Sequence, residues 1–264
     1  NVWRFDIDDV VPPAGKEAVL LAELGGPQGA TTQPITTRPE LASITKSGTS
    51  YNVVFVGTGR YLGNDNGASP YGDVGNTDQQ SVYAFKDNLT DAGLGALRKS
   101  RSMVQQTLGN IAVDGDPAAL RTVSNEPVDW AINSGWYVDF NPDNTSPGER
   151  VDVTMQQHQG TLTVATNVPD PSPCSSGGSS FLYYFDFASG SYLLTASMYG
   201  DTPVVGVKVS SDALTAGIGT VMLSTGDTAT IIMKTDGERT SSKDPGSAPT
   251  SGSARRVFWR ELTN

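Results

Sequence analysis

The stretch Leu162-Thr163-Val164-Ala165-Thr166-Asn167, followed by Leu182-Tyr183-Tyr184-Phe185-Asp186, contains two short strand motifs that recur in this chain in the same order. The first motif ends in a small residue, Thr and then Gly or Asn, and its other copies are Val54-Phe55-Val56-Gly57-Thr58-Gly59 and Val221-Met222-Leu223-Ser224-Thr225-Gly226. The second is an aromatic strand ending in an acid, and its other copies and relatives are Val82-Tyr83-Ala84-Phe85-Lys86-Asp87, Val257-Phe258-Trp259-Arg260-Glu261 and Val2-Trp3-Arg4-Phe5-Asp6. A repeated strand pair at irregular intervals indicates a unit that buries its apolar face only by stacking on its copies. We therefore predict an all-β fold, a β-propeller or a C-terminal part of one, with long irregular loop insertions.

The composition agrees with many short strands joined by turns. The 264 residues include 29 Gly and 16 Pro, and 37% are apolar. Gly and Pro break helices and mark turns, and the best helical prospect, Ala92 to Met103, contains two glycines. We treat residues 1–264 as a single domain. The lone cysteine, Cys174, cannot form an internal disulfide.

Charge and hydropathy exclude several classes of partner. The formal net charge is −10, which disfavours nucleic acid and anionic lipid. No run of about 18 apolar residues is present, so we predict no membrane span. The chain opens within a strand at Asn1 to Asp6, and we expect it to be the C-terminal piece of a longer protein whose export signal lies on the other part.

Few residues are suited to catalysis. His158 is the only histidine, and it has no Gly-x-Ser-x-Gly motif beside it. One histidine and one cysteine do not make a zinc site of ordinary composition. The glycine-rich stretch Gly57 to Gly63 lacks the spacing of a dinucleotide loop. Asp6, Asp87 and Asp186 end repeated strands, where we expect them to form hydrogen bonds in turns or at strand ends. We predict no catalytic residue and no cofactor-binding residue in this segment.

A metal site is the one ligand site that the residues suggest. The polar stretch from Asn64 to Asp78 is rich in the carboxylate and amide oxygens that calcium prefers, and its candidate ligands are Asp65, Asp73 and Asp78, with Asn64 and Asn66 beside them. Asp114 and Asp116 are further candidates. The spacing does not match an EF-hand loop. Asn/Asp/Gly stretches also form ordinary turns, which is the alternative for these residues.

Several segments in order resemble the C-terminal propeller of the type IV pilus tip-associated adhesins, the PilY/PilC family. The similar segments are Asn1–Asp6, Gln33–Glu40, Val54–Gly63, Gln80–Phe85, Gly135–Asp139, Gly148–Val151, Thr166–Pro169 and Arg255–Leu262.

The resemblance implies a modified, PilY-type β-propeller on an exported protein of the cell surface or pilus tip. It implies a non-enzymatic role in pilus biogenesis, twitching motility and adhesion. The partners it implies are minor pilins at the tip of the fimbrium, the remainder of the same propeller, and a host or abiotic surface. The calcium loop of the family precedes the segment similar to Asn1–Asp6, so calcium is implied for the upstream part of the intact protein.

Two other functions compete with this interpretation. An exported propeller enzyme, such as a quinone-dependent dehydrogenase or a glycosidase, needs carboxylates or a cofactor that converge on a funnel. A carbohydrate-binding propeller needs exposed aromatic rings, and the tryptophans nearest to loops are Trp130 and Trp136, for which we expect burial.

The repeats also predict packing. The four phenylalanines Phe5, Phe85, Phe185 and Phe258 are expected to occupy equivalent core positions. The strand Val2–Asp6 must pair along its edge with another strand, from a missing part, a neighbouring molecule or the strand Arg255–Leu262.

Overall fold

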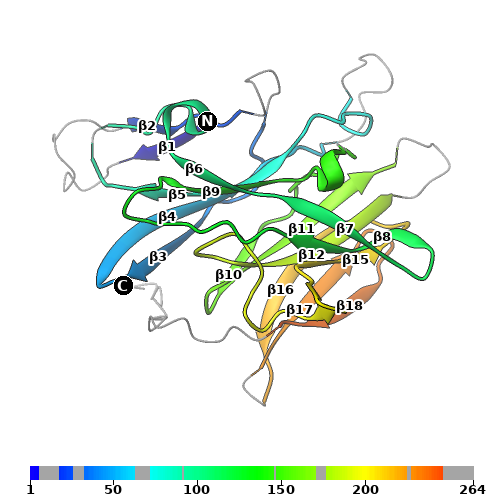
Figure 1. Ribbon diagram of the computed structural model, residues 1–264. Helices are drawn as coiled ribbons and strands as arrows, with labels where there is room; N and C mark the ends of the chain where they lie inside the picture. The colour runs from blue at the N-terminus through cyan, green and yellow to red at the C-terminus, as the bar shows by residue number, and fades with distance from the viewer. Residues whose placement is uncertain are drawn as a thin grey trace, which may run out of the picture.

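The computed structural model describes residues 1–5, 18–25, 33–62, 72–90, 92–145, 147–170, 177–224 and 227–245. Strands make up nearly all of their regular structure, so the predicted all-β class is confirmed (Figure 1). The exceptions are α1 (Leu97–Ser100) and the 3-10 turn η2 (Pro142–Asn144). The helix is shorter than the predicted Ala92 to Met103, because Gly93 lies against the backbone of Leu20 and Gly95 has a φ of 69°. Among the described residues, no helix has the length and apolarity needed to cross a bilayer.

The chain begins with an N-terminal ribbon, formed by the antiparallel strands β1 (Val2–Phe5) and β2 (Ala18–Ala22). One edge of the opening strand is thus met by β2, a partner not among those predicted from the sequence, and the predicted partners stay a prediction for its other edge. Pairing with a strand close in sequence closes a short loop and costs less chain entropy than pairing with a distant one. Arg255–Leu262 lies outside the described residues.

The first sheet has five strands in the order β3-β4-β5-β9-β6. Their bounds are β3 (Glu40–Lys46), β4 (Thr49–Gly57), β5 (Ser81–Asp87), β6 (Met103–Gln106) and β9 (Gly135–Asp139). All neighbours are antiparallel except β6 and β9. The first-motif strand β4 pairs with the second-motif strand β5, as the repeat predicts.

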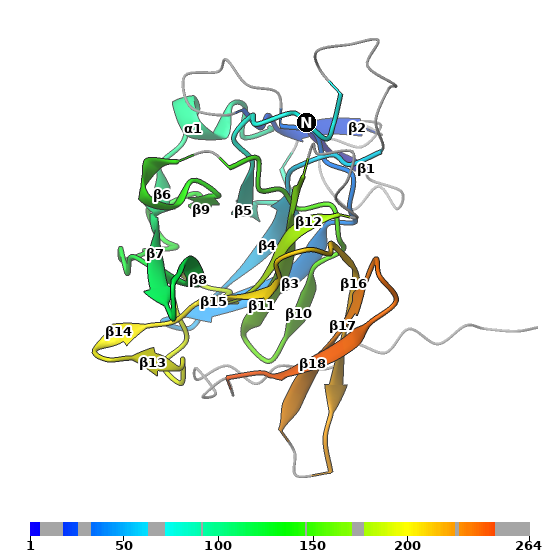
Figure 2. The ribbon, with the colours of Figure 1, turned by 90° about the vertical axis from the view of Figure 1, so that its right-hand side faces the viewer.

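The second sheet has six strands in the order β10-β11-β12-β15-β8-β7. Their bounds are β7 (Leu108–Val113), β8 (Asp116–Val123), β10 (Gln156–His158), β11 (Thr161–Pro169), β12 (Gly178–Asp186) and β15 (Gly206–Ser210). Here too the first-motif strand β11 pairs with the second-motif strand β12. Only Thr107 separates β6 from β7, so one stretch of chain passes from the edge of the first sheet to the edge of the second (Figure 2).

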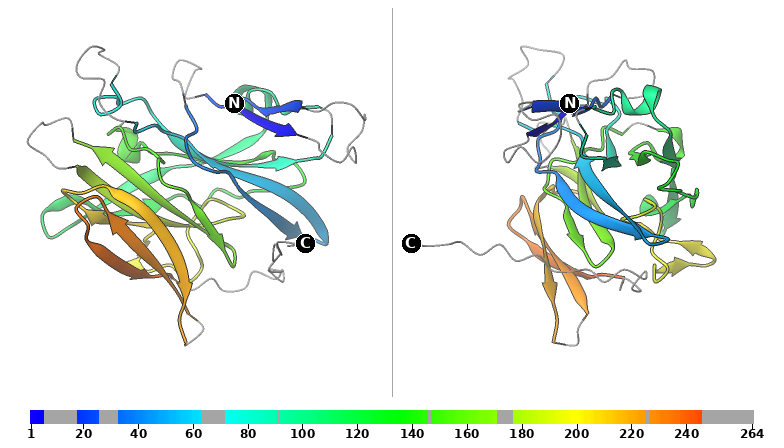
Figure 3. Two further views of the ribbon diagram at one scale, coloured as in Figure 1. Left: turned by 180° about the vertical axis from the view of Figure 1, so that it is seen from behind. Right: turned by 90° about the vertical axis from the view of Figure 1, so that its left-hand side faces the viewer.

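The third sheet contains β16 (Thr215–Met222), β17 (Thr228–Lys234) and β18 (Arg239–Lys243). A small hairpin of β13 (Met198–Tyr199) and β14 (Thr202–Pro203) precedes it. The ribbon, the first sheet, the second sheet and the third sheet follow one another as layers (Figure 3), although β7 and β8 of the second sheet precede β9 of the first sheet in the chain.

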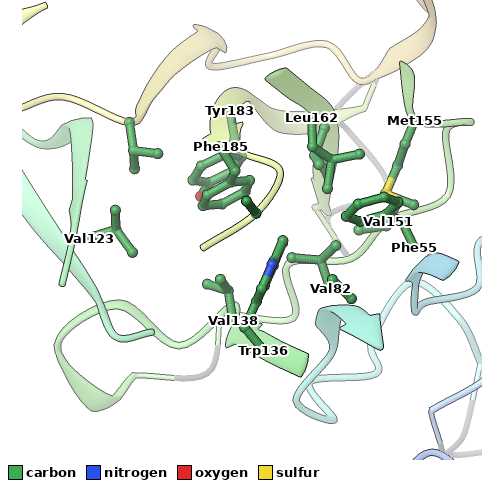
Figure 4. Close-up of a cluster of buried hydrophobic side chains, with 14 of the residues drawn as sticks. Phe55, Val82, Val123, Trp136, Val138, Val151, Met155, Leu162, Tyr183 and Phe185 are labelled. Atoms are coloured by element: carbon green, nitrogen blue, oxygen red, sulfur yellow. The ribbon is translucent and has the colours of Figure 1, made fainter. Parts of the chain in front are cut away.

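Apolar clusters fill the space between successive layers. The largest lies between the first and second sheets, where Trp136 meets Phe185 with ring centroids 6.4 Å apart (Figure 4). A second cluster joins the ribbon and α1 to the first sheet, and a third joins the second sheet to the third. Trp130 and Trp136 are buried, as expected, with exposed fractions of 1% and 0%.

The predicted equivalence of the phenylalanines holds for two of them. Phe85 and Phe185 are fully buried, whereas Phe5 is 67% exposed. Phe5 was wrongly assigned to the core because it lies on the outer side of the ribbon, where no described layer covers it. Phe258 lies outside the described residues.

The third copy of the first motif also departs from its relatives. Val54 and Val56 are buried, but Met222 and Leu223 are 62% and 41% exposed. Their segment continues past the end of the third sheet into the turn before β17, where Leu223 N–H donates to Asp227 O. An apolar pattern beyond the edge of a layer has nothing to pack against.

Candidate functional site: a polar junction at residues 148–152

The segment Gly148-Glu149-Arg150-Val151-Asp152 joins the ends of the two first-motif strands. Val151 N–H donates to Thr58 O at 2.9 Å, at the end of β4. Arg150 exchanges two backbone hydrogen bonds with Asn167 of β11, each 2.9 Å long. We call this segment the polar junction, because it contacts the first and second sheets directly and is linked to the third through Asn167.

Glycines of the first motif allow this close approach. A Cβ on Gly57 would lie 2.4 Å from Val151 Cγ1, and one on Gly59 would lie 2.4 Å from Arg150 Cβ. Gly59 also has a φ of 137°, which favours glycine. The small residues of the motif are therefore required by packing against the junction.

Arg150 organises the loop after β4. Its side chain is buried, and its guanidinium donates to backbone carbonyl oxygens only: those of Gly148 at 2.9 Å, Arg60 at 3.0 Å, Asn76 at 2.6 Å and Asp73. Burial lowers the pKa of this guanidinium, and the nearby carboxylates of Asp152 and Asp73 partly offset that effect. Arginine stays protonated at such positions, so it acts as a fixed cation that gathers four carbonyl groups.

One of the predicted metal ligands, Asp73, lies beside this cation, because its backbone carbonyl accepts from Arg150. Asp73 accepts hydrogen bonds from Arg60 Nε at 2.6 Å and from Leu62 N–H at 2.8 Å. Burial raises the pKa of Asp73, but these two donors outweigh it, and the pKa lies below its ordinary value.

Asp78 instead pairs with Asn76, whose Oδ1 accepts its backbone N–H at 2.7 Å. Asp65 lies outside the described residues. In the part of the chain that the structure describes, no three His, Cys, Asp or Glu side chains are grouped as a metal site requires. The metal site at this loop stays a prediction.

Glu149 is the buried acid of the junction. Its Oε1 accepts from Tyr183 OH at 2.5 Å and from Thr166 Oγ1 at 2.6 Å, and Arg121 lies 3.4 Å from Oε2. Burial, together with the charge of Glu149, raises the pKa of Tyr183 well above its ordinary value. Each partner of this carboxylate is held by the second sheet, so the network ties the junction to that sheet.

A related arrangement surrounds the equivalent tyrosine of the first sheet. Arg98 donates to Tyr83 OH at 2.7 Å and pairs with Asp139, and its guanidinium lies 4.1 Å from the ring centroid of Tyr137. Burial raises the pKa of Tyr83 to about 12. Thus each repeat tyrosine meets an arginine that is paired with an acid.

Sequence reasoning missed these arginines and their acids. The signal that could have found them is the tyrosine shared by the second-motif copies at 83 and 183. A buried phenol needs a hydrogen-bond partner, so a repeated tyrosine in a core strand predicts a repeated polar partner.

Asp152 completes the junction on the side of the third sheet. Its Oδ1 accepts from Asn167 Nδ2 at 2.8 Å. Burial raises the pKa of Asp152 to about 6, although the Asn167 bond and the charge of Arg150 act in the opposite direction. The pKa of this carboxyl is therefore raised toward neutral pH from its ordinary value of 3.8.

The acids at the strand ends bond turns, as predicted. Asp87 Oδ1 accepts from Leu89 N–H and from Arg4, and Asp186 Oδ1 accepts from Ala188 N–H and Ser189 N–H. His158 lies on β10, away from the junction segment in the sequence, and its Nε2 is buried with no hydrogen-bond partner among the described residues. Asp6 and Cys174 lie outside the described residues.

The relatives found by comparison with known proteins belong to one family. No family model matches the chain. The sequence is 30% identical over 201 residues to the type IV pilus biogenesis factor PilY1 homolog of Xylella fastidiosa, and 29% identical over 221 residues to type IV pilus biogenesis factor PilY1 of Pseudomonas aeruginosa. Each match covers 72% of this chain, but only 12% and 18% of those relatives, so the chain spans a small part of their length.

A solved structure agrees with the fold. The crystal structure of the Pseudomonas aeruginosa PilY1 C-terminal domain superposes with a TM-score of 0.60 at 21% sequence identity. The match covers 83% of this chain and 46% of that one. This likeness confirms the predicted all-β, propeller-type fold.

Proposed function

Over the matched residues this chain is a PilY1-family protein, and from that relationship we propose that it is a non-enzymatic structural and interaction module of a type IV pilus-associated protein. In this role it supports pilus assembly, twitching motility and surface adhesion. The proposed location is the exported face of the bacterial envelope, at the cell surface or pilus tip. Its proposed partners are the remainder of its own propeller, minor pilins, and through them a host or abiotic surface.

The observation that carries the proposal is the orientation of the aromatic strands. Tyr83 and Phe85 of the first sheet face the ribbon, which is the preceding layer. Tyr183 and Phe185 of the second sheet face the first sheet, again the preceding layer. The repeat therefore turns its aromatic side chains toward the layer before it.

The same orientation leaves a face of the ribbon that no described layer covers. Val2 packs toward the first sheet, while Trp3 and Phe5 point the other way and are 53% and 67% exposed. Large apolar side chains side by side on one face are typical of an interaction surface. By analogy with the two inner interfaces, this face fits the sheet of a preceding layer.

At the opposite end of the layers, the outer face of the third sheet is likewise not covered by any described strand. Ile218 and Ile232 of the third sheet pack toward the second sheet. Val221, Ile231 and Met233 lie on the other face and are 37%, 38% and 44% exposed. The proposed module thus offers an apolar face at each end to the rest of a propeller.

The polar junction supports a structural role. Glu149 and Arg150 are buried, and their hydrogen-bonding groups are directed at other groups of the protein. An acid–base catalyst must reach a substrate proton, whereas these groups hold sheets and loops together.

The proposal is tested in the intact protein of a piliated bacterium. Trp3 and Phe5 are replaced together by Ser, and Leu194→Ser serves as the control, because Leu194 is 85% exposed in a different part of the surface. We expect the double variant to reduce pilus number and twitching at an unchanged level of the exported protein, and the control to behave as wild type. Normal pili and twitching in the double variant contradict the role of this face. Hydrolase or dehydrogenase turnover by the purified chain contradicts the non-enzymatic role.

A further inference from the structure

The third sheet is fastened to the second at the beginning of β16. Asn167 lies at the end of the repeated motif in β11. Its side-chain amide forms two hydrogen bonds with the backbone of Thr215, as the backbone of a neighbouring strand would. Its Nδ2 donates to Thr215 O at 2.9 Å, and its Oδ1 accepts from Thr215 N–H at 2.7 Å. Asn167 and Thr215 are each 2% exposed, so this pair of bonds is shielded from water.

The carboxyl group of Asp152 contacts the same side-chain amide of Asn167. The Nδ2 group that bonds Thr215 O also donates to Asp152 Oδ1 at 2.8 Å. The carboxyl, the amide and the first residue of β16 thus form one connected cluster. Separation of the third sheet removes Thr215 from this cluster, so the amide of Asn167, which also bonds the half-buried Asp152, loses its neighbour on that side.

The charged surroundings of Asp152 are simple. Arg150, on its own segment, is the charged side chain that acts on it. The groups that face it from β11 and β16 in the cluster, Asn167 and Thr215, are neutral. The Arg150 guanidinium donates to the carbonyl groups of Arg60 and Asn76 and, within the junction, to that of Gly148, so its donors are directed away from a direct ion pair with Asp152.

We propose that Asp152 is an acid-sensitive latch between the second and third sheets, so that proton uptake tightens the attachment of β16–β18 and proton loss loosens it. The function of the latch is to make the last layer, with its outer apolar face, respond to the acidity outside the cell.

The direction follows from linkage. Burial raises the pKa of Asp152 to about 6 in the docked state, from an ordinary value of 3.8 when the carboxyl is hydrated. The docked state therefore binds the proton more tightly, and attachment strengthens as the pH falls through 6 toward 4. Above pH 7 the carboxyl is ionised in both states, and its burial weakens the attachment.

Hydrogen exchange of the full chain tests the latch. Protection factors, which are corrected for the intrinsic pH dependence of exchange, are measured for the amides of β16–β18 at pH 7 and pH 5. The pKa difference predicts protection roughly tenfold higher at pH 5. The amides of β4 and β5 in the first sheet serve as an internal reference and are expected to change little.

Two variants isolate the carboxyl. Asp152→Asn keeps an acceptor for Asn167 without the charge, so the protection of β16–β18 is expected to be high at both pH values. Glu126→Gln, which neutralises an exposed acid, is the matched control and is expected to keep the tenfold response. An unchanged pH response in Asp152→Asn overturns the proposal.

A measurement on the unmodified chain covers the case in which Asp152→Asn does not fold. The carboxyl carbon of Asp152 is followed by NMR as the pH is changed. A titration midpoint near 6, accompanied by chemical shift changes at the Thr215 amide, supports the latch. A midpoint at or below about 4, the range of an ordinary aspartate, overturns it.

Discussion

The strands β12 and β1 carry the same aromatic pattern and have opposite surroundings. In β12, Phe185 is fully buried and its ring stacks on Tyr183 with centroids 5.4 Å apart. In β1, Phe5 and Trp3 are mostly exposed. Both strands point their aromatic side chains toward the position of the preceding layer, but only β12 has such a layer among the described residues.

The difference shows that the aromatic pattern specifies on which face of the strand the rings lie, whereas a neighbouring layer is needed to bury them. Apolar side chains stabilise a fold by the area they remove from water, and an aromatic ring at the outer side of a ribbon removes little. The contribution of equivalent residues to stability should therefore differ greatly between the inner sheets and the ribbon.

The largest expected effect is that of Phe185→Ala. Deleting this ring opens a cavity in the cluster between the first and second sheets, and we expect the free energy of unfolding to fall by about 3–5 kcal/mol. Denaturant unfolding followed by tryptophan fluorescence measures the change, since Trp136 lies in the same cluster. A loss below about 1 kcal/mol contradicts the assigned core position.

Glu149→Gln tests the polar part of the same interface. Gln keeps an acceptor for Thr166 but leaves the buried guanidinium of Arg121 without its counter-charge, so we expect a loss of about 2–3 kcal/mol in the free energy of unfolding. Asp116→Asn is the matched control. It removes the acid of the Lys208 pair, whose side-chain exposures of 18% and 35% predict a loss within about 0.5 kcal/mol.

Arg4→Ala tests how the ribbon is held. Arg4 donates to Asp87 Oδ1 at 2.6 Å, which joins β1 to the end of β5. We expect protection against hydrogen exchange in β1 and β2 to fall about tenfold, which equals about 1.4 kcal/mol, while the second sheet is unaffected. Arg38→Ala is the control, because Arg38 pairs with Glu40 at an exposed position. If protection fell equally in the ribbon and in the second sheet, the ribbon would not open separately from the rest of the chain.

Phe5→Ala is expected to have the smallest effect. Since the side chain is 67% exposed, the free energy of unfolding of this chain should change by no more than about 0.5 kcal/mol. The measurement is the same denaturant unfolding as for Phe185→Ala. A loss comparable to that of Phe185→Ala would break the comparison, since it would mean that the outer side of the ribbon is covered in solution.

Much of the fold could be predicted from the order of the two motifs. The pairs β4–β5 and β11–β12 are the adjacent antiparallel strands that the repeat indicates. The motif failed at Val221 to Leu223 and at Phe5, because a periodic pattern reports which side of a strand is apolar and not whether a layer lies there.

Less of the candidate site could be predicted. The partners of the polar junction come from distant parts of the chain: Glu149 meets Tyr183, and Arg150 meets the carbonyl groups of Arg60 and Asn76. Their residue types are ordinary, and nothing in their spacing indicates that they meet. Asp73 could be recognised from the sequence as an acid in a polar loop. Its hydrogen bond with Arg60 depends on how that loop is folded.

The amino-acid order alone indicates the all-β class and the recurrence of the strand pair, because alternation along a strand is a local property of the backbone. The stacking of the layers settles the rest. It decides that Tyr183 is buried and Trp3 is exposed, that Glu149 needs Arg121, and that the pKa of Asp152 rises to about 6. These outcomes depend on distances between residues far apart in the chain, and burial and electrostatic interaction act through those distances.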